Sequence, residues 1–241
     1  MRKINSFLLS SVFVVGFTGV AHAGFADGND YQFQVWTGSY SALGLSGTPA
    51  NASTATLTGL PQGKPTASFN YTGPIDFSVG ASETNSVSNF FGTTVGGISN
   101  YSSSSGLTES AFLASTLSSP YQNVGGSLNS SAFVTFMEIT GNYSAPAGTV
   151  VTISHDDGAS LYSGVSNMPL ILSGSPTTEI PSSIALAAAS ATPFTLVYVE
   201  ANGAPSVLQI SETLPVPEPG SLAVLGTGLI GLVLIRRRRR A

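Results

Sequence analysis

The chain contains no cysteine, and only 8% of its residues are charged, against roughly 25% in ordinary globular domains. Without cysteine, disulfide stabilisation, thiol catalysis and cysteine-ligated zinc are excluded, so a folded domain must depend on a packed core. Gly, Ser, Thr and Asn take the places of the missing charged residues. Because Ser, Thr and Asn side chains compete with the backbone hydrogen bonds of a helix, this composition favours strands and turns.

Basic residues are almost missing from the body of the chain. Seven of the eight lie at the two ends. Between Gly24 and Val216 there are eleven carboxylates and one basic residue, Lys64. This segment therefore has a net charge of −10, which repels phosphate backbones, and it offers no basic patch to bind them. We expect no nucleic-acid partner.

The first 23 residues have the composition of a targeting segment. Met1-Arg2-Lys3 is followed by an apolar run from Phe7 to Val20 and then by Ala21-His22-Ala23. A charged start, an apolar run and an A-x-A site are typical of a secretory signal peptide. The alternative is a short anchor helix that stays attached. We predict a signal helix over residues 1–23, whose removal leaves Gly24 as the first residue of the exported protein.

The last 27 residues form a second targeting segment. Val216-Pro217-Glu218-Pro219-Gly220 precedes an apolar run over residues 221–235, which ends at the arginine cluster 236–240. The apolar run is shorter than the roughly 20 residues that span a bilayer, and the arginines hold their side on the cytoplasmic face. An ordinary tail anchor explains the helix and the arginines but leaves the Pro-Glu-Pro sequence without a role.

These three parts, in this order over residues 215–241, resemble the PEP-CTERM sorting signal of Gram-negative bacteria. The resemblance implies a short C-terminal membrane helix over residues 221–235 and processing by an exosortase near the Pro-Glu-Pro sequence. It also implies transient anchoring in the inner membrane, with the domain in the periplasm, followed by release to the cell surface or the extracellular matrix. Proteins of this family often accompany exopolysaccharide production, so the resemblance also implies a polysaccharide partner.

Residues 24–214 show the rhythm of short strands between turns. Ser- and Asn-rich stretches at 99–105 and 117–131 are expected to be surface loops, and the alanines of 184–191 make the only helix-like stretch. Repeated short strands with Gly and Asn turns predict an all-β fold, an antiparallel β-sandwich or barrel. The expected strands are 31–36, 67–71, 132–139, 149–154, 194–199 and 206–210.

One segment of residues 24–214 contains candidate ligand-binding residues. The strand over residues 150–155 ends at Asp156-Asp157-Gly158, and Leu161-Tyr162 follows. The structural alternative is a hairpin whose Asp-Gly pair makes a tight turn. Together with the strand 194–199, the loop 200–204 and the last strand, this pattern resembles the protective-antigen-type β-sandwich domain, which occurs in bacterial toxins, glycosidase inserts and flocculin-type adhesins.

In the adhesin branch, two consecutive aspartates joined by a cis peptide bind calcium, and the metal holds vicinal hydroxyls of a sugar. The resemblance implies that Asp156 and Asp157 are the paired ligands and that Asn202 is a further one. Calcium is a hard cation that takes six to eight oxygen ligands, which carboxylates supply together with charge. Other members of the wider family keep the Asp-Asp-Gly sequence for structure alone. Three aromatic residues are candidates either for a sugar-binding face or for the core: Trp36, Tyr162 and Tyr198.

Catalysis is not expected. Ser154-His155-Asp156 are adjacent in a strand, where alternate side chains point to opposite faces and cannot form a triad. Glycoside hydrolysis needs two carboxylates ~5–9.5 Å apart across a cleft, and no second acidic motif accompanies the Asp-Asp pair. The expected function is an exported surface or matrix-associated binding module for carbohydrate, using calcium. The alternative is a structural protein of the envelope or exopolysaccharide matrix without a small ligand.

Overall fold

The computed structural model describes residues 24–25, 30–45, 50–53, 64–121, 128–164, 169–176, 178–215 and 236. The predicted signal helix 1–23 and the predicted membrane helix 221–235 lie outside these residues. No helix in the described part of the chain is long and apolar enough to cross a membrane.

Eleven strands and three short helices follow one another along the described chain. In order, they are β1 Asp30–Ser39, β2 Ala67–Thr72, β3 Asp76–Val79, α1 Val87–Phe91, the 3-10 helix η1 Gly92–Gly97, β4 Ile98–Ser102, α2 Glu109–Leu113, β5 Phe133–Ala145, β6 Val150–Asp156, β7 Gly158–Ser163, β8 Pro169–Ser173, β9 Ile180–Ala185, β10 Ala189–Glu200 and β11 Ser206–Thr213.

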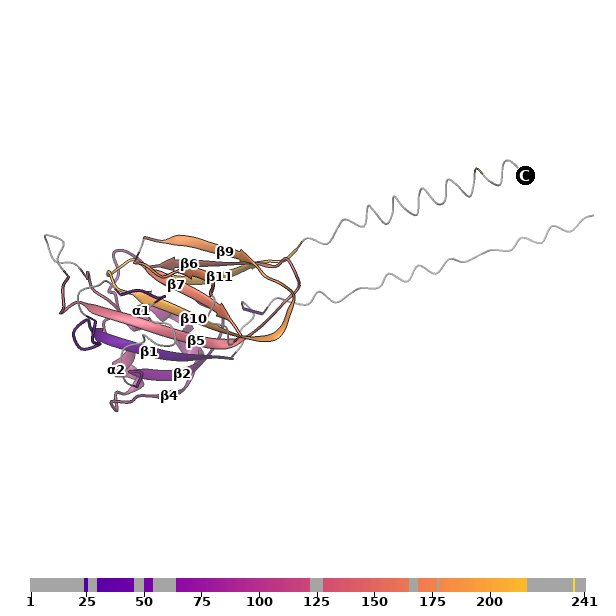
Figure 1. Cartoon of the computed structure of the whole chain (residues 1–241). Helices are drawn as coiled ribbons and strands as arrows, with labels where there is room; N and C mark the ends of the chain where they lie inside the picture. The colour runs from indigo at the N-terminus through magenta and orange to yellow at the C-terminus, as the bar shows by residue number, and fades with distance from the viewer. Residues whose placement is uncertain are drawn as a thin grey trace, which may run out of the picture.

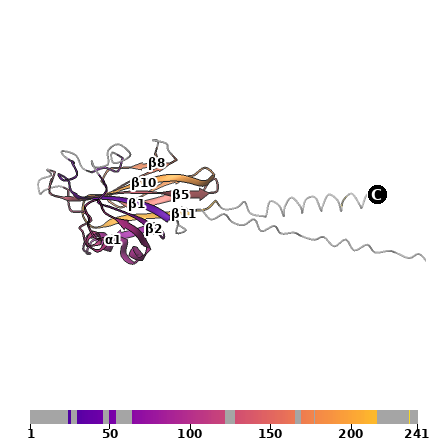
Figure 2. The ribbon, with the colours of Figure 1, turned by 90° about the horizontal axis from the view of Figure 1, so that it is seen from below.

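The strands form two antiparallel sheets that face each other (Figures 1 and 2). The larger sheet has the order β4-β2-β1-β5-β10-β7-β8, and the smaller has the order β3-β11-β6-β9. In β1, Tyr31, Phe33 and Val35 are buried while the alternating residues Asp30, Gln32 and Gln34 are more exposed, as expected for a strand with one face on a core. The prediction of an all-β antiparallel sandwich is confirmed.

Aromatic rings dominate the core between the sheets. Phe33 of β1 and Phe69 of β2 stack at a centroid distance of 5.0 Å, and Phe77 of β3 contacts Phe91 of α1 at 4.7 Å. Helix α1 begins at Ser86, whose hydroxyl accepts a hydrogen bond from the Asn89 N–H, and so presents Phe90 and Phe91 to the core. Without disulfides, such edge-to-face and stacked aromatic contacts supply much of the packing.

A second hydrophobic cluster covers the outer face of the larger sheet. It contains Trp36, Tyr40, Phe136, Tyr162 and Val199, all buried. Because β7 and the end of β10 are covered on both faces, their sequences are buried without alternation. This double coverage explains the continuous apolar run of the strand predicted at 194–199.

Two local predictions are wrong. Residues 184–191 are not helical: β9 ends at Ala185, β10 begins at Ala189, and Leu186 hydrogen-bonds to Thr149 between them. The expected loop at 99–105 contains most of β4, an edge strand in which Asn100 adopts a positive φ of 53°. The expected loop at 117–131 has no regular strand or helix in its described residues.

The Asp-Asp-Gly segment is a crossing between sheets and not a hairpin turn. Strand β6 belongs to the smaller sheet and β7 to the larger, and the two do not pair with each other. Gly158 begins β7 beside the end of β8, where a Cβ atom would collide with the carbonyl oxygen of Gly174 and lie 2.9 Å from Val199. The glycine is therefore required by a close backbone approach.

We expect Gly158→Ala to destabilise the domain by ~1–3 kcal/mol, because the colliding atom is backbone and cannot move aside as a side chain can. Gly96→Ala is the matched control, since a Cβ at this exposed position meets nothing within 4 Å. Its effect should stay within about 0.5 kcal/mol. Chemical denaturation of both variants gives the comparison, and equal stabilities would contradict the account of this crossing.

Candidate functional site

The end of β6 and the loop after β10 meet at one end of the sandwich. Asp156 pairs with Val207 near the start of β11, and Ala201, just after β10, donates its N–H to Asp157 Oδ2 at 2.8 Å. The loop that holds Asn202 therefore lies directly beside the two aspartates. The peptide bond between Asp156 and Asp157 is cis, as the resemblance implied.

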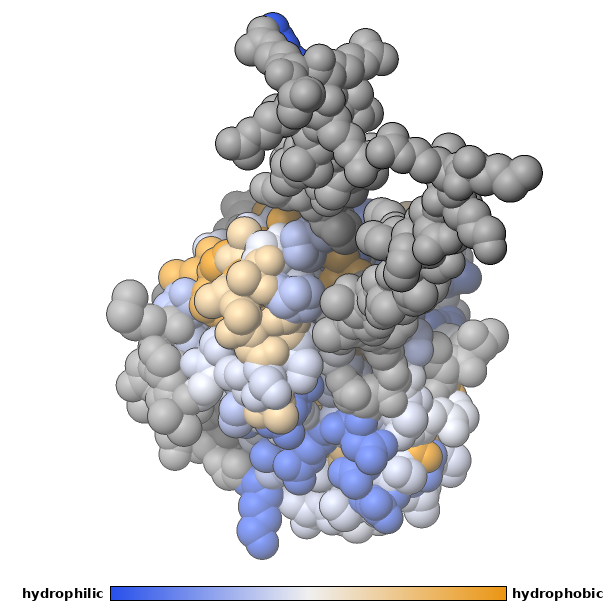
Figure 3. All heavy atoms as spheres, turned by 90° about the vertical axis from the view of Figure 1, so that its right-hand side faces the viewer, coloured by the Kyte–Doolittle hydropathy of each residue, from blue (hydrophilic) through white to orange (hydrophobic). Residues whose placement is uncertain are grey.

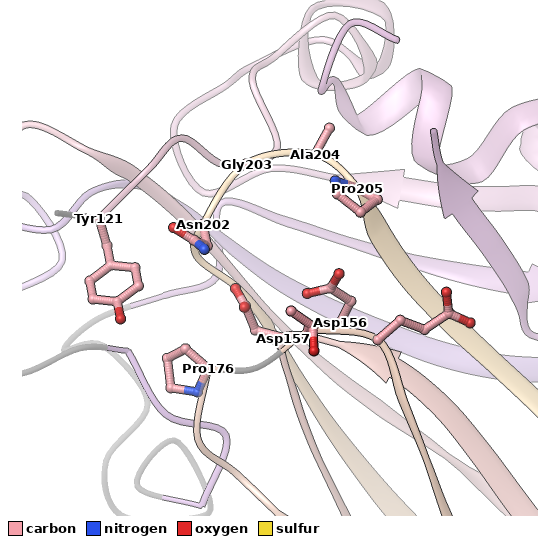
Figure 4. Close-up of a pocket in the computed structure, with 10 residues that line it drawn as sticks. Tyr121, Asp156, Asp157, Pro176, Asn202, Gly203, Ala204 and Pro205 are labelled. Carbon is pink, nitrogen blue, oxygen red and sulfur yellow. The ribbon is translucent and has the colours of Figure 1, made fainter. Parts of the chain in front are cut away.

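A pocket of about 500 Å³ opens at this point. Asp156, Asp157 and Asn202, the three predicted ligands, all line it, and Figure 4 shows them on neighbouring walls. The structure thus brings the predicted residues together in one concave site. The other lining residues are Tyr121, Pro176, Thr178, Glu179, Gly203, Ala204 and Pro205.

Glu200 is a third carboxylate, which the sequence reasoning missed. Ligand atoms of Asp156, Asp157 and Glu200 all lie within 4.8 Å of one another, close enough to share one metal ion. The three residues are 7%, 1% and 0% exposed, respectively. The sequence does contain a feature that could have pointed to Glu200: it is a carboxylate at the end of an apolar strand, immediately before the loop that contains Asn202.

Hydrogen bonds hold Glu200 from inside the protein. Its Oε1 accepts from the Ser118 hydroxyl at 2.7 Å, and its Oε2 lies 3.0 Å from the Tyr198 hydroxyl oxygen. Glu200 is not among the residues that line the pocket. Its charge therefore reaches the cluster from the core side, whereas Asp156 and Asp157 face the pocket.

Ser118 also fixes the loop that contains Asn202. Its hydroxyl oxygen accepts from the Gly203 N–H at 2.9 Å and from the Asn85 side-chain amide at 2.7 Å. The side-chain oxygen of Asn85, Oδ1, in turn accepts from the Ser206 hydroxyl at 3.2 Å. Three separate segments are thereby tied to one edge of the pocket, which gives Asn202 a defined position.

His155 supports the site from behind and is unsuited to acid–base catalysis. Its Nδ1 lies 2.7 Å from the carbonyl oxygen of Asp157, which can only accept, so Nδ1 carries the hydrogen. Nε2 then accepts from the Ser182 hydroxyl at 2.9 Å. Burial lowers the pKa of His155, which keeps the ring neutral. Both ring nitrogens are therefore engaged, one with the backbone of Asp157 and the other with the Ser182 side chain of β9.

The clustered carboxylates resist ionisation when no cation is near. Burial raises the pKa of Asp156 to about 7, and the charge of Asp157 acts in the same direction. Burial also raises the pKa of Glu200 well above its usual range, again with a contribution from Asp157. A divalent cation would relieve both effects, because it supplies charge where the protein has none. An all-oxygen donor set with this charge fits calcium or another hard cation.

The three aromatic candidates belong to the core. Trp36, Tyr162 and Tyr198 are buried, and the Tyr198 hydroxyl donates to the carbonyl oxygen of Asp156. Tyr121, which was not predicted, is the aromatic residue that lines the pocket. In Figure 4 its ring lies to the left of Asn202, and Asp156 lies to the right.

Comparison with known proteins identifies the C-terminal segment. The model of the PEP-CTERM protein-sorting motif matches residues 215–240. The tail is a PEP-CTERM sorting motif. A PEP-CTERM motif implies export, sorting to the cell surface and processing by an exosortase. No curated protein matches the chain by sequence.

The body is similar in fold to solved PA14 domains. A PA14 sugar-binding domain from an RTX adhesin superposes with a TM-score of 0.51 at 14% identity, over 77% of this chain and 89% of that one. The PA14 domain of the MpAFP antifreeze protein gives a TM-score of 0.49 at 12% identity, over 88% of this chain and 87% of the other. The first similarity establishes a two-sheet sandwich of PA14 type.

The pocket and the C-terminal end of β11 lie at opposite ends of this sandwich. In β6, Asp156 is at the pocket end, whereas Val150 pairs with Thr213 at the end of β11, two residues before the motif begins. The seven residues of β6 separate the two ends by about 20 Å. Figure 1 shows these strands running along the length of the sandwich.

Proposed function

We propose that this protein is a calcium-dependent carbohydrate-binding module displayed at the cell surface by its PEP-CTERM motif. The observation that supports it is the pocket in which Asp156, Asp157 and Asn202 converge in front of the buried Glu200. In this proposal Asp156 and Asp157 bind the ion directly, and Asn202 contributes its side-chain oxygen. Glu200 adds negative charge and fixes the inner side of the site.

Calcium bound in this way keeps open coordination positions on the pocket side. The ion takes six to eight oxygens, and two carboxylates with one amide oxygen supply only part of that number. A pair of vicinal hydroxyls is a bidentate oxygen donor that can complete the shell. The pocket volume of about 500 Å³ lies within the range of small-molecule sites and suits a sugar residue.

The charge and shape of the pocket favour a neutral sugar. Asp156, Asp157 and Glu179 line it, and no lysine or arginine is among its lining residues. Even with a divalent ion bound, the carboxylates leave the site without excess positive charge, so uronates and sulfated sugars are disfavoured. Tyr121 offers an apolar ring face on which the C–H side of a sugar can rest.

The arrangement of the two ends supports display. In the proposal, the apolar run 221–235 first holds the protein at the inner membrane, with the domain in the periplasm. The end nearest the motif contains the connection between β9 and β10, whose exposed residues include Ala185, Ala187 and Ala188. Figure 3 looks at this end and shows an apolar patch on it. The pocket, at the far end, would point away from the membrane.

A glycan array probed with the mature domain tests the proposal. We expect binding to neutral sugars with vicinal hydroxyls in the presence of calcium and loss of binding in chelator and in Asp157→Asn. Asp76→Asn is the matched control, because Asp76 is an exposed carboxylate of β3 outside the pocket. Tyr121→Ala should retain calcium and lose about 1 kcal/mol of sugar affinity, roughly fivefold.

Two outcomes would reject this function. Binding that ignores chelator would remove the metal from the mechanism. No binding to any sugar would favour the structural role, in which Asp157 serves only to accept the Ala201 N–H and to order the loop after β10.

A further inference from the structure

Gly24 and Phe25 form backbone hydrogen bonds with residues of three different strands. The Gly24 N–H donates to the Ser144 carbonyl oxygen at 2.8 Å, and the Phe25 N–H donates to Glu212 Oε1 at 2.8 Å. The Phe25 carbonyl oxygen accepts from the Tyr31 hydroxyl. Strands β1, β5 and β11, from both sheets, thus provide the hydrogen-bond partners of this dipeptide.

The side chain of Phe25 anchors the dipeptide in the core. Its ring is fully buried, stacks on Tyr143 at 4.6 Å and contacts Phe194 at 4.7 Å. Burying a phenylalanine side chain stabilises the folded state by roughly 1.5–3 kcal/mol, so the Phe25 ring holds this part of the chain against the core. Gly24, the residue just before it, is therefore fixed beside Ser144, one residue away from the N–H that Glu212 accepts.

We propose that the signal peptide is cut between Ala23 and Gly24 and that the new α-ammonium group of Gly24 occupies this prepared site, bound by the Ser144 carbonyl and the Glu212 carboxylate. The proposal rests on the predicted signal peptide and is independent of the calcium site. Hydrolysis by a signal peptidase adds one water: Ala23 leaves with a carboxylate, and Gly24 keeps an amine that is protonated at neutral pH. One amide N–H becomes three N–H donors with a positive charge.

Charge and distance both favour this site for an ammonium group. Glu212 accepts from the N–H of the next residue, so its carboxylate lies one residue away from the Gly24 nitrogen, and a rotation of the Glu212 side chain would bring its second oxygen toward an ammonium group there. Tyr31 and Tyr143 also contact the dipeptide, the first through its hydroxyl and the second through its ring. In a body with a net charge of −10, whose one Lys or Arg residue is Lys64, the new terminus supplies a second positive charge. A charge-assisted hydrogen bond of this kind is stronger than the hydrogen bond from a neutral amide N–H that it replaces.

Two measurements test the proposal. Intact-mass analysis of the exported protein should give a chain that begins at Gly24. Thermal unfolding should then compare a form that begins at Gly24 with the same form acetylated on that amine. We expect acetylation to lower Tm by about 2–4 °C in the wild type and by less than about 1 °C in Glu212→Gln. Glutamine keeps an oxygen for the Phe25 N–H and removes only the charge.

Glu83→Gln is the matched control, because Glu83 also accepts a backbone N–H, from Gly80, on the exposed surface. In this variant acetylation should cost as much as in the wild type. A different first residue, no cost of acetylation, or an equal cost in Glu212→Gln would overturn the proposal. If Glu212→Gln does not fold, the acylation rate of the Gly24 amine decides: a bound ammonium should react about tenfold more slowly than the free dipeptide, and an equal rate rejects the site.

Discussion

Chelator should lower the Tm of the mature domain by roughly 5–10 °C at pH 7.5. The estimate follows from mass action: calcium at a hundred times its dissociation constant stabilises the folded state by ~2.7 kcal/mol, and each kcal/mol shifts Tm by about 2–4 °C in a domain of this size. The physical cause is the cluster of Asp156, Asp157 and Glu200, whose repulsion the ion removes. Differential scanning calorimetry with and without chelator measures the shift.

The variant Asp157→Asn isolates this effect. Asparagine keeps an oxygen for the Ala201 N–H and removes the carboxylate that raises the pKa of both Asp156 and Glu200, so the calcium-free variant should be at least as stable as the calcium-free wild type. Chelator should leave its Tm within about 1 °C. Asp76→Asn, with the pocket intact, should respond to chelator as the wild type does. A wild-type Tm that ignores chelator would show that the carboxylates serve structure alone.

The calcium-free protein should lose stability as pH rises from about 4 to 7, which is the reverse of the usual behaviour of carboxylates. The unfolded pKa of aspartate is about 3.9, whereas burial and Asp157 raise that of folded Asp156 to about 7, and Glu200 is raised as well. In this window the folded state binds more protons than the unfolded state, so the free energy of unfolding falls by ~1.4 kcal/mol per pH unit for each group. From pH 5 to 7 the Tm should drop by at least about 5 °C.

Calcium should remove this pH dependence at the upper end, because it binds the ionised carboxylates. It should therefore raise Tm strongly at pH 7.5 and little at pH 5. Asp156→Asn supplies the control: without the titrating group, the decline between pH 5 and 7 should become shallower. A calcium-free Tm that rises over this interval in the wild type would contradict the proposed burial of the acidic cluster.

The fold class could be predicted from local patterns, because alternating strands with Gly and Asn turns are typical of a sandwich. The grouping of Asp156, Asp157 and Asn202 came from the resemblance to the protective-antigen-type domain, and the structure places the three residues around one pocket. The alanines at 184–191 suggested a helix that does not form. Helix nucleation is unfavourable in so short a segment, and its two ends pair with neighbouring strands instead, the first with β6 and the second with β5. Tertiary pairing overrode the local propensity there.

The missed parts of the site depend on contacts between distant segments. Glu200 joins the aspartates only because β10 pairs with β7 and β11 pairs with β6, so that both chain crossings fall at one end of the sandwich. Tyr121 comes from an irregular segment that Ser118 ties to the same place. Neither contact has a periodic signature in the sequence, since strand order is set by the packing of the whole domain.

Calorimetric titration of the mature domain with calcium, followed by titration of the calcium-loaded domain with a neutral sugar from the array, is the most direct test of the central claim. The account predicts one calcium site per chain with a dissociation constant of about 10⁻⁴–10⁻³ M, as in other extracellular modules, and sugar binding that requires the ion. Asp156→Asn and Asp157→Asn should each abolish both signals, whereas Asp76→Asn should preserve them. The absence of calcium binding at millimolar concentration in the wild type would contradict the account and leave the Asp-Asp pair as a structural crossing between the two sheets.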